Sequence, residues 1–181
     1  VTAHTTYKVL SNNTLDITFD ATTDKETVVN MTNHSYFNLN GDPSKEGTNM
    51  WLYINADNFT PADSTYMTTG EIRPVEGTPM DFRKAHALEE TINNTSFDQI
   101  RNASGYDHNW CLNTYKDGKG NDTEVCAVLW SPVTKIGLSM YTNEPGVQVY
   151  TGNFQGTGVS CKHGIKYPKH VSVCLESQKY P

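Results

Sequence analysis

The stretch Val171-Ser-Val-Cys-Leu-Glu176 alternates apolar and polar residues at every position. Successive side chains of a β-strand point to opposite faces, so the two valines and the leucine share one face of this segment. Ser172, Cys174 and Glu176 share the other face. The stretch therefore predicts a strand that turns one side to a hydrophobic core and a carboxylate to the opposite side.

The same period of two recurs along the chain, with turn signals between the alternating runs. The runs lie at residues 15–19, 28–31, 51–54, 125–130, 136–141, 147–149 and 171–175. Asn, Gly and Pro cluster between them, as in Asn143-Glu-Pro-Gly146. One short helix is predicted over residues 83–93, where Ala85, Leu88 and Ile92 lie on one side. These patterns predict an all-β fold of the sandwich type, as a single domain over residues 1–181.

The composition agrees with β structure and excludes several classes of function. Of the 181 residues, 36% are hydrophobic and 19% are charged, and much of the rest is Thr and Asn, which favour strands and turns. No apolar run approaches the roughly 20 residues of a membrane-spanning helix. A net charge of −6 with only three arginines argues against nucleic-acid binding. No signal peptide is visible, and we favour a cytoplasmic location.

Neither the cysteines nor the histidines form a sequence-local metal motif. The cysteines contain no C-x-x-C pair, and no two of the six histidines are two or four residues apart. We therefore expect no metal site, and we expect all four cysteines to be reduced thiols in strands. The cysteines are Cys111, Cys126, Cys161 and Cys174.

Two further segments place polar side chains on faces that are not simple hydrophobic core. In Thr32-Asn-His-Ser-Tyr36, His34 shares a face with the first and last residues. Gln148 and Tyr150 lie on one face of their strand, and Val147 and Val149 lie on the other face. Together with Glu176, these residues predict a polar sheet face that offers an imidazole, an amide, a carboxylate and aromatic rings. Such a face is suited to a sugar, because it combines hydrogen-bond donors, acceptors and a stacking surface.

The block Val29-Asn-Met-Thr-Asn-His-Ser-Tyr-Phe-Asn-Leu-Asn-Gly41, which contains His34, resembles the histidine motif of the aldose 1-epimerase (galactose mutarotase) family. Gly105-Tyr-Asp-His-Asn109 and Cys174-Leu-Glu-Ser-Gln178 resemble two further blocks of that family. Four more lie at residues 54–61, 69–72, 77–82 and 144–153. All seven occur in the family's order, which makes coincidence remote.

The resemblance implies a large antiparallel β-sandwich that interconverts the α and β anomers of free hexoses such as galactose and glucose. It implies His34 as the general acid on the ring oxygen and Glu176 as the general base on the anomeric hydroxyl. Asp107 would hold sugar hydroxyls, and Gln148 would line the same site. A His/Glu pair suits this reaction because both pKa values can be tuned towards neutrality. The chemistry requires no cofactor.

Each of these residues also has a purely structural reading. Without its motif, His34 would be a hydrogen-bonded structural histidine and Glu176 a solvated carboxylate of an edge strand. Asp107 could be a turn residue, and Gln148 could simply pair with a neighbouring strand. His108 would face away from Asp107, which indicates either plain packing or a supporting role behind the site residues. If the catalytic reading is right, the four site residues surround one open polar pocket, with His34 and Glu176 several ångströms apart and room for a sugar ring between them.

The chain also departs from the family, whose members are longer. The resemblance covers the central and C-terminal part of the family's domain. We therefore expect no counterpart here of an arginine and a second histidine that lie in the family's N-terminal part and bind the sugar. The C-terminal tail that follows the glutamate strand in the family is also missing from this chain. We therefore expect a fragment whose partners are a free hexose and the missing part of the same protein, with no nucleic acid or membrane. A non-catalytic carbohydrate-binding β-sandwich, a phosphosugar epimerase and a domain of a fusion protein stay open as alternatives.

Overall fold

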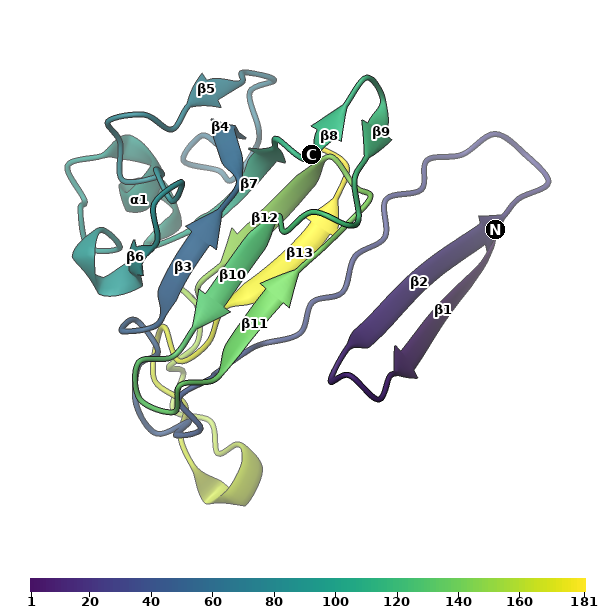
Figure 1. Cartoon of the computed structure of the whole chain (residues 1–181). Coiled ribbons are helices and arrows are strands. Elements are labelled where there is room, and N and C mark those ends of the chain that lie inside the picture. Colours follow the sequence, from purple (N-terminus) through teal and green to yellow (C-terminus); the bar gives the residue numbers. More distant parts are fainter. The chain divides into compact units, whose positions relative to one another are not determined.

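The computed structural model describes residues 1–181 and divides them into two compact units, Val1–Thr32 and Asn33–Pro181. Nearly all regular structure in both units is antiparallel β (Figure 1). No helix of the chain is long and apolar enough to cross a membrane.

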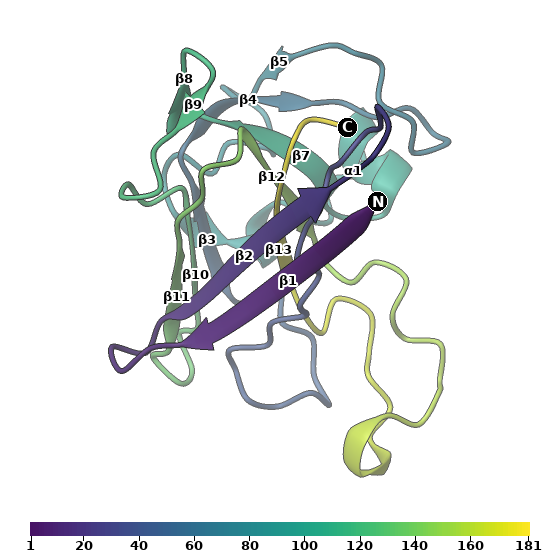
Figure 2. The same cartoon turned by 90° about the vertical axis from the view of Figure 1, so that its right-hand side faces the viewer.

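The first unit is a long hairpin, seen with its strands side by side in Figure 2. Strands β1 (Thr2–Val9) and β2 (Leu15–Thr22) pair over eight positions, from Thr2 opposite Thr22 to Val9 opposite Leu15. Paired residues share a face, so Tyr7, Val9, Leu15 and Ile17 lie on one side and polar residues lie on the other. The alternation read at residues 15–19 thus predicts β2 correctly.

Two antiparallel sheets form the second unit. One sheet has the strand order β11-β10-β3-β6, and the other has the order β13-β12-β7-β4-β5. Strands β8 and β9 form a separate small hairpin. The bounds are Trp51–Ile54 for β3, Ala56–Thr60 for β4, Arg73–Pro74 for β5, His86–Ala87 for β6, Asp107–Leu112 for β7, Tyr115–Lys116 for β8, Lys119–Gly120 for β9, Ala127–Trp130 for β10, Gly137–Met140 for β11, Gly146–Tyr150 for β12 and Cys174–Gln178 for β13.

The hydrophobic core lies between these two sheets. Leu52 and Leu129 of the four-stranded sheet belong to the same buried cluster as Trp110 and Val149 of the five-stranded sheet. Strands β3 and β4 are separated only by Asn55 but belong to different sheets, so the chain turns a corner of the sandwich there (Figure 1). The predicted all-β antiparallel sandwich is confirmed.

Helical structure is limited to α1 (Asp98–Ala103) and two single turns of 3₁₀ helix, Leu88–Glu90 and Lys162–Gly164. The prediction of a helix over residues 83–93 is wrong. Within that range, His86–Ala87 form β6, which pairs with β3, and only one helical turn follows it. A helix this short has little stability of its own, so the strand pairing prevails.

Two other expectations also need correction. Residues 28–31 form no strand, and Val28 is exposed. All four cysteines are free thiols, but Cys161 is exposed in a loop rather than placed in a strand, and Cys126 lies just before β10.

Candidate functional site

Three neighbouring strands bring the predicted site residues into register. Strand β12 lies between β7 and β13, and Gln148 of β12 is directly opposite both Glu176 and Asn109. Two pairs further along, Tyr150 is opposite both Cys174 and Asp107. Directly opposed residues share a face, so all of these side chains lie on the same face of the five-stranded sheet.

The alternation of the sequence explains why this face is polar. Leu175, Val149 and Trp110 alternate with the site residues and are buried in the core on the other side of the same strands. His108 also points to that side, where its ring packs against Phe59 and Trp110. The expectation that His108 packs away from Asp107 is confirmed.

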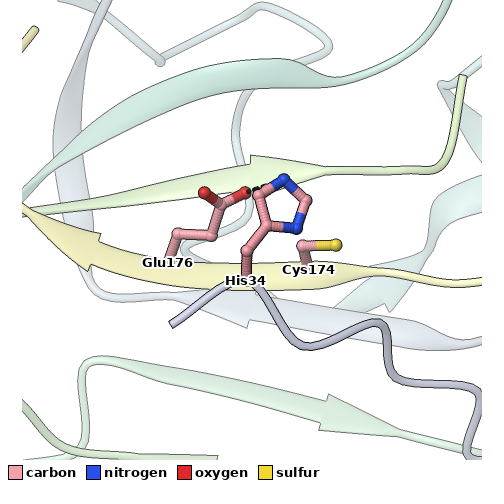
Figure 3. Close-up of side chains that lie close together, drawn as sticks. All are labelled: His34, Cys174 and Glu176. Carbon is pink, nitrogen blue, oxygen red and sulfur yellow. Dashed lines mark ion pairs between the residues drawn. The ribbon is translucent and has the colours of Figure 1, made fainter. Parts of the chain in front are cut away.

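His34 reaches this face from an extended segment that runs along the edge of β13. Phe37 and Val173 exchange two backbone hydrogen bonds of 2.8 and 2.9 Å, which anchor the segment three residues beyond His34. His34 Nε2 then lies 3.4 Å from Glu176 Oε1 (Figure 3). The side chain of His34 is 47% exposed and that of Glu176 is 9% exposed, so the histidine is open to solvent and the acid is largely buried.

A chain of hydrogen bonds holds the remaining polar groups. Gln148 Nε2 donates to Asp107 Oδ1 at 2.8 Å, and Gln178 Nε2 donates to Gln148 Oε1 at 3.2 Å. Gln178 Nε2 also donates to Asn109 Oδ1 at 3.3 Å. The side-chain nitrogen of Asn109, Nδ2, is buried and has no hydrogen-bond partner in the protein. The network fixes the Asp107 carboxylate and leaves Asn109 with an unused donor.

Burial and neighbouring charges perturb both carboxylates. Burial raises the pKa of Glu176, and the Asp107 carboxylate adds to that shift while His34 opposes it. Burial also raises the pKa of Asp107, although the hydrogen bond from Gln148 and the charge of His34 oppose this shift. Two acids with raised pKa values beside a histidine are typical of a site that transfers protons.

The structure therefore brings all four predicted residues together, but their spacing differs from the expectation. His34 and Glu176 are in direct contact, so the predicted gap for a sugar ring between them is wrong. None of the four lines either of two open cavities, of about 940 and 490 Å³. The ring oxygen and the anomeric hydroxyl of a sugar are bonded to the same carbon, so an acid and a base that serve them can be close neighbours.

Three further residues adjoin His34 and Glu176. The rings of Tyr36 and Tyr150 lie 4.9 and 6.0 Å from the His34 ring, and Cys174 lies beside Glu176 on the same face of β13. The period of two places Tyr150 and Cys174 on this face, but it does not reveal that they adjoin His34. Trp110, a third aromatic residue on these strands, is fully buried in the core on the other face of the sheet.

Known proteins with similar sequences cover the chain almost completely. Galactose mutarotase of Homo sapiens is 38% identical over 172 residues, which are 95% of this chain and 47% of the human protein. Aldose 1-epimerase of Escherichia coli (strain K12) is 37% identical over 175 residues, 97% of this chain and 48% of the bacterial protein. The chain thus spans about half the length of the curated relatives it matches.

Solved structures and a family profile agree with these relatives. The crystal structure of galactose 1-epimerase from Lactobacillus acidophilus NCFM superposes with a TM-score of 0.81 at 30% identity, over 99% of this chain and 48% of that one. An aldose epimerase homologue from C. elegans gives a TM-score of 0.81 at 29% identity, over 97% of this chain and 50% of that one. The profile of the aldose 1-epimerase family matches residues 1–181, and the chain belongs to this family.

Proposed function

We propose that this chain carries the acid and the base of an aldose 1-epimerase, which interconverts the α and β anomers of free hexoses such as galactose and glucose. The observation that carries the proposal is the contact between His34 and Glu176, 3.4 Å apart beside the Asp107–Gln148 pair. Membership of the family and the names of its relatives support the same reaction.

In the proposed mechanism, Glu176 removes the proton of the anomeric hydroxyl while His34 delivers a proton to the ring oxygen. The C1–O5 bond breaks and the open-chain aldehyde forms. Rotation about the bond between the first two carbons presents the other face of the carbonyl, and the reverse transfers close the ring. Each group therefore acts once as an acid and once as a base, and both return to their starting states.

The surroundings of Glu176 suit the role of a base. Its carboxylate is buried, and burial raises its pKa, which brings its basicity closer to that required at neutral pH. The nearby Asp107 adds to this effect because a second negative charge makes the proton harder to lose. His34 lies beside this carboxylate and is open to solvent.

The remaining groups of the face are suited to holding the sugar. Asp107 and Gln148 offer an acceptor and an amide that are already held in place by their mutual hydrogen bond. Tyr36 is 51% exposed, and its ring offers an apolar surface to the C–H bonds of a pyranose. Because the curated relatives are about twice as long, we also propose that further binding groups come from the part of the protein that corresponds to the rest of their length.

The test is polarimetry on fresh α-galactose with the full protein, corrected for the spontaneous rate. Glu176→Gln keeps the size of the side chain but removes the base, so the catalysed rate should fall about 100-fold or more. His34→Asn should do the same. The double variant should be much less than multiplicatively slower, because both transfers serve one ring-opening step.

Matched controls come from exposed residues of the same types, Glu89→Gln and His163→Asn, which should keep the full rate. Near-normal turnover of Glu176→Gln would contradict the proposed roles. If the unaltered protein binds galactose without accelerating mutarotation, the chain belongs to a carbohydrate-binding protein rather than an enzyme.

A further inference from the structure

Cys174 brings a thiol to the group formed by His34 and Glu176. Cys174 and Glu176 are two residues apart on β13 and point to the same side, and His34 lies over them (Figure 3). A ring nitrogen of His34, the sulfur of Cys174 and a carboxylate oxygen of Glu176 lie within 4.8 Å of one another. The proposed mechanism uses the imidazole and the carboxylate but gives the thiol no task.

We propose that His34, Cys174 and Glu176 form a binding site for a zinc-like divalent cation, and that a cation bound there inhibits the epimerase. This inference rests on the proposed function, because inhibition presupposes that His34 and Glu176 move the protons. It concerns regulation of the site rather than its chemistry. The linear spacing of His and Cys residues predicts no such site, because the three ligands meet only in the folded chain.

The geometry suits a tetrahedral ion. With bonds of about 2.0–2.2 Å to nitrogen and oxygen, two ligand atoms of a tetrahedral zinc ion lie about 3.4 Å apart. His34 Nε2 and Glu176 Oε1 are 3.4 Å apart in the structure. The Cys174 sulfur lies within 4.8 Å of the other two ligand atoms, so the three side chains must close by up to about 1 Å around a bound ion. Three protein ligands leave the fourth position of the ion to water.

The set of donor atoms selects the type of ion. Nitrogen, thiolate and carboxylate ligands together favour zinc and similar borderline metals, whereas magnesium and calcium require oxygen ligands. Burial raises the pKa of the Cys174 thiol to about 12, so the ion must displace the thiol proton, which passes to the buffer. The bound ion would occupy a ring nitrogen of His34 and one oxygen of Glu176, so His34 could not carry its proton at that nitrogen and the carboxylate of Glu176 would be a weaker base.

The first experiment measures mutarotation of α-galactose by the full protein as zinc chloride is added. We expect the rate to fall at least tenfold at saturating zinc and to recover when EDTA is added. Cys174→Ala and Cys174→Ser remove the thiolate with little change in volume, and each should raise the zinc concentration for half-inhibition at least tenfold. Each variant is compared with its own rate in the absence of zinc.

The matched control is Cys161→Ala, which removes an exposed thiol elsewhere in the chain and should leave zinc inhibition unchanged. A second measurement does not depend on activity: titration with Co²⁺ should produce a thiolate-to-cobalt charge-transfer band that both Cys174 variants lose and Cys161→Ala retains. Equal inhibition of the Cys174 variants and the unaltered protein, or no such band, would overturn the site. If the unaltered protein is not an epimerase, the cobalt band still decides whether the metal site exists.

Discussion

Lowering the pH from 7 to 5 should destabilise the protein through His108. This side chain is only 2% exposed, with its ring against those of Phe59 and Trp110. Nδ1 accepts a hydrogen bond of 3.1 Å from the backbone N–H of Asp107, so the proton of the neutral ring sits on Nε2, which is buried without a partner. Burial lowers the pKa of His108 to about 4, from an ordinary value of 6.5.

The sign and size of the effect follow from proton linkage. Between the two pKa values the unfolded chain binds a proton that the folded chain excludes, so stability falls as the pH decreases. The contribution is fully present above pH 6.5 and is lost as the pH falls towards 4. The complete shift corresponds to about 3 kcal/mol, of which about 2 kcal/mol should be lost between pH 7 and pH 5.

Urea denaturation at pH 7 and pH 5 measures this loss. His108→Asn removes the titrating group but keeps an acceptor for the N–H of Asp107, and the unaltered protein should lose about 2 kcal/mol more than the variant over this range. The raised pKa values of Asp107 and Glu176 act in the opposite direction and cancel in the comparison. His163→Asn, at an exposed position, should behave like the unaltered protein. Equal pH dependence in His108→Asn and the unaltered protein would refute the reasoning.

Two further predictions concern binding and folding. Asp107→Ala should raise the KM for galactose and lower kcat/KM by about tenfold or more, because the carboxylate would hold sugar hydroxyls in both the ground state and the transition state. Polarimetric assays measure both constants, and an unchanged KM would exclude that role. Gly105→Ala should lower the thermal midpoint, at a cost of about 1–3 kcal/mol or more, because Gly105 has a φ of +140° and an added Cβ would collide with Asn153 and His170. Gly118→Ala, at a φ of +77° with open space around it, should lower the midpoint less, and equal losses would show that the collision is unimportant.

The local pattern of apolar and polar residues was sufficient to predict most of the strands. The alternation at residues 51–54 and 147–149 predicts β3 and β12, because period two describes a strand with one buried face. It fails at residues 28–31, which form no strand. It also fails at residues 83–93, where pairing of β6 with β3 overrides a short helical pattern. The second error concerns long-range pairing, which a local period does not contain.

The site divides in the same way between sequence and tertiary structure. Alternation places Glu176, Gln148 and His34 on faces away from the core, and the family's motifs add Asp107. The tertiary structure decided that β12 lies between β7 and β13, and that His34 contacts Glu176 instead of facing it across a gap. It also placed Cys174 beside both. Alternation specifies which side of a strand a residue occupies, whereas the distance between residues far apart in the chain depends on strand order and register, which arise only when the whole sheet assembles.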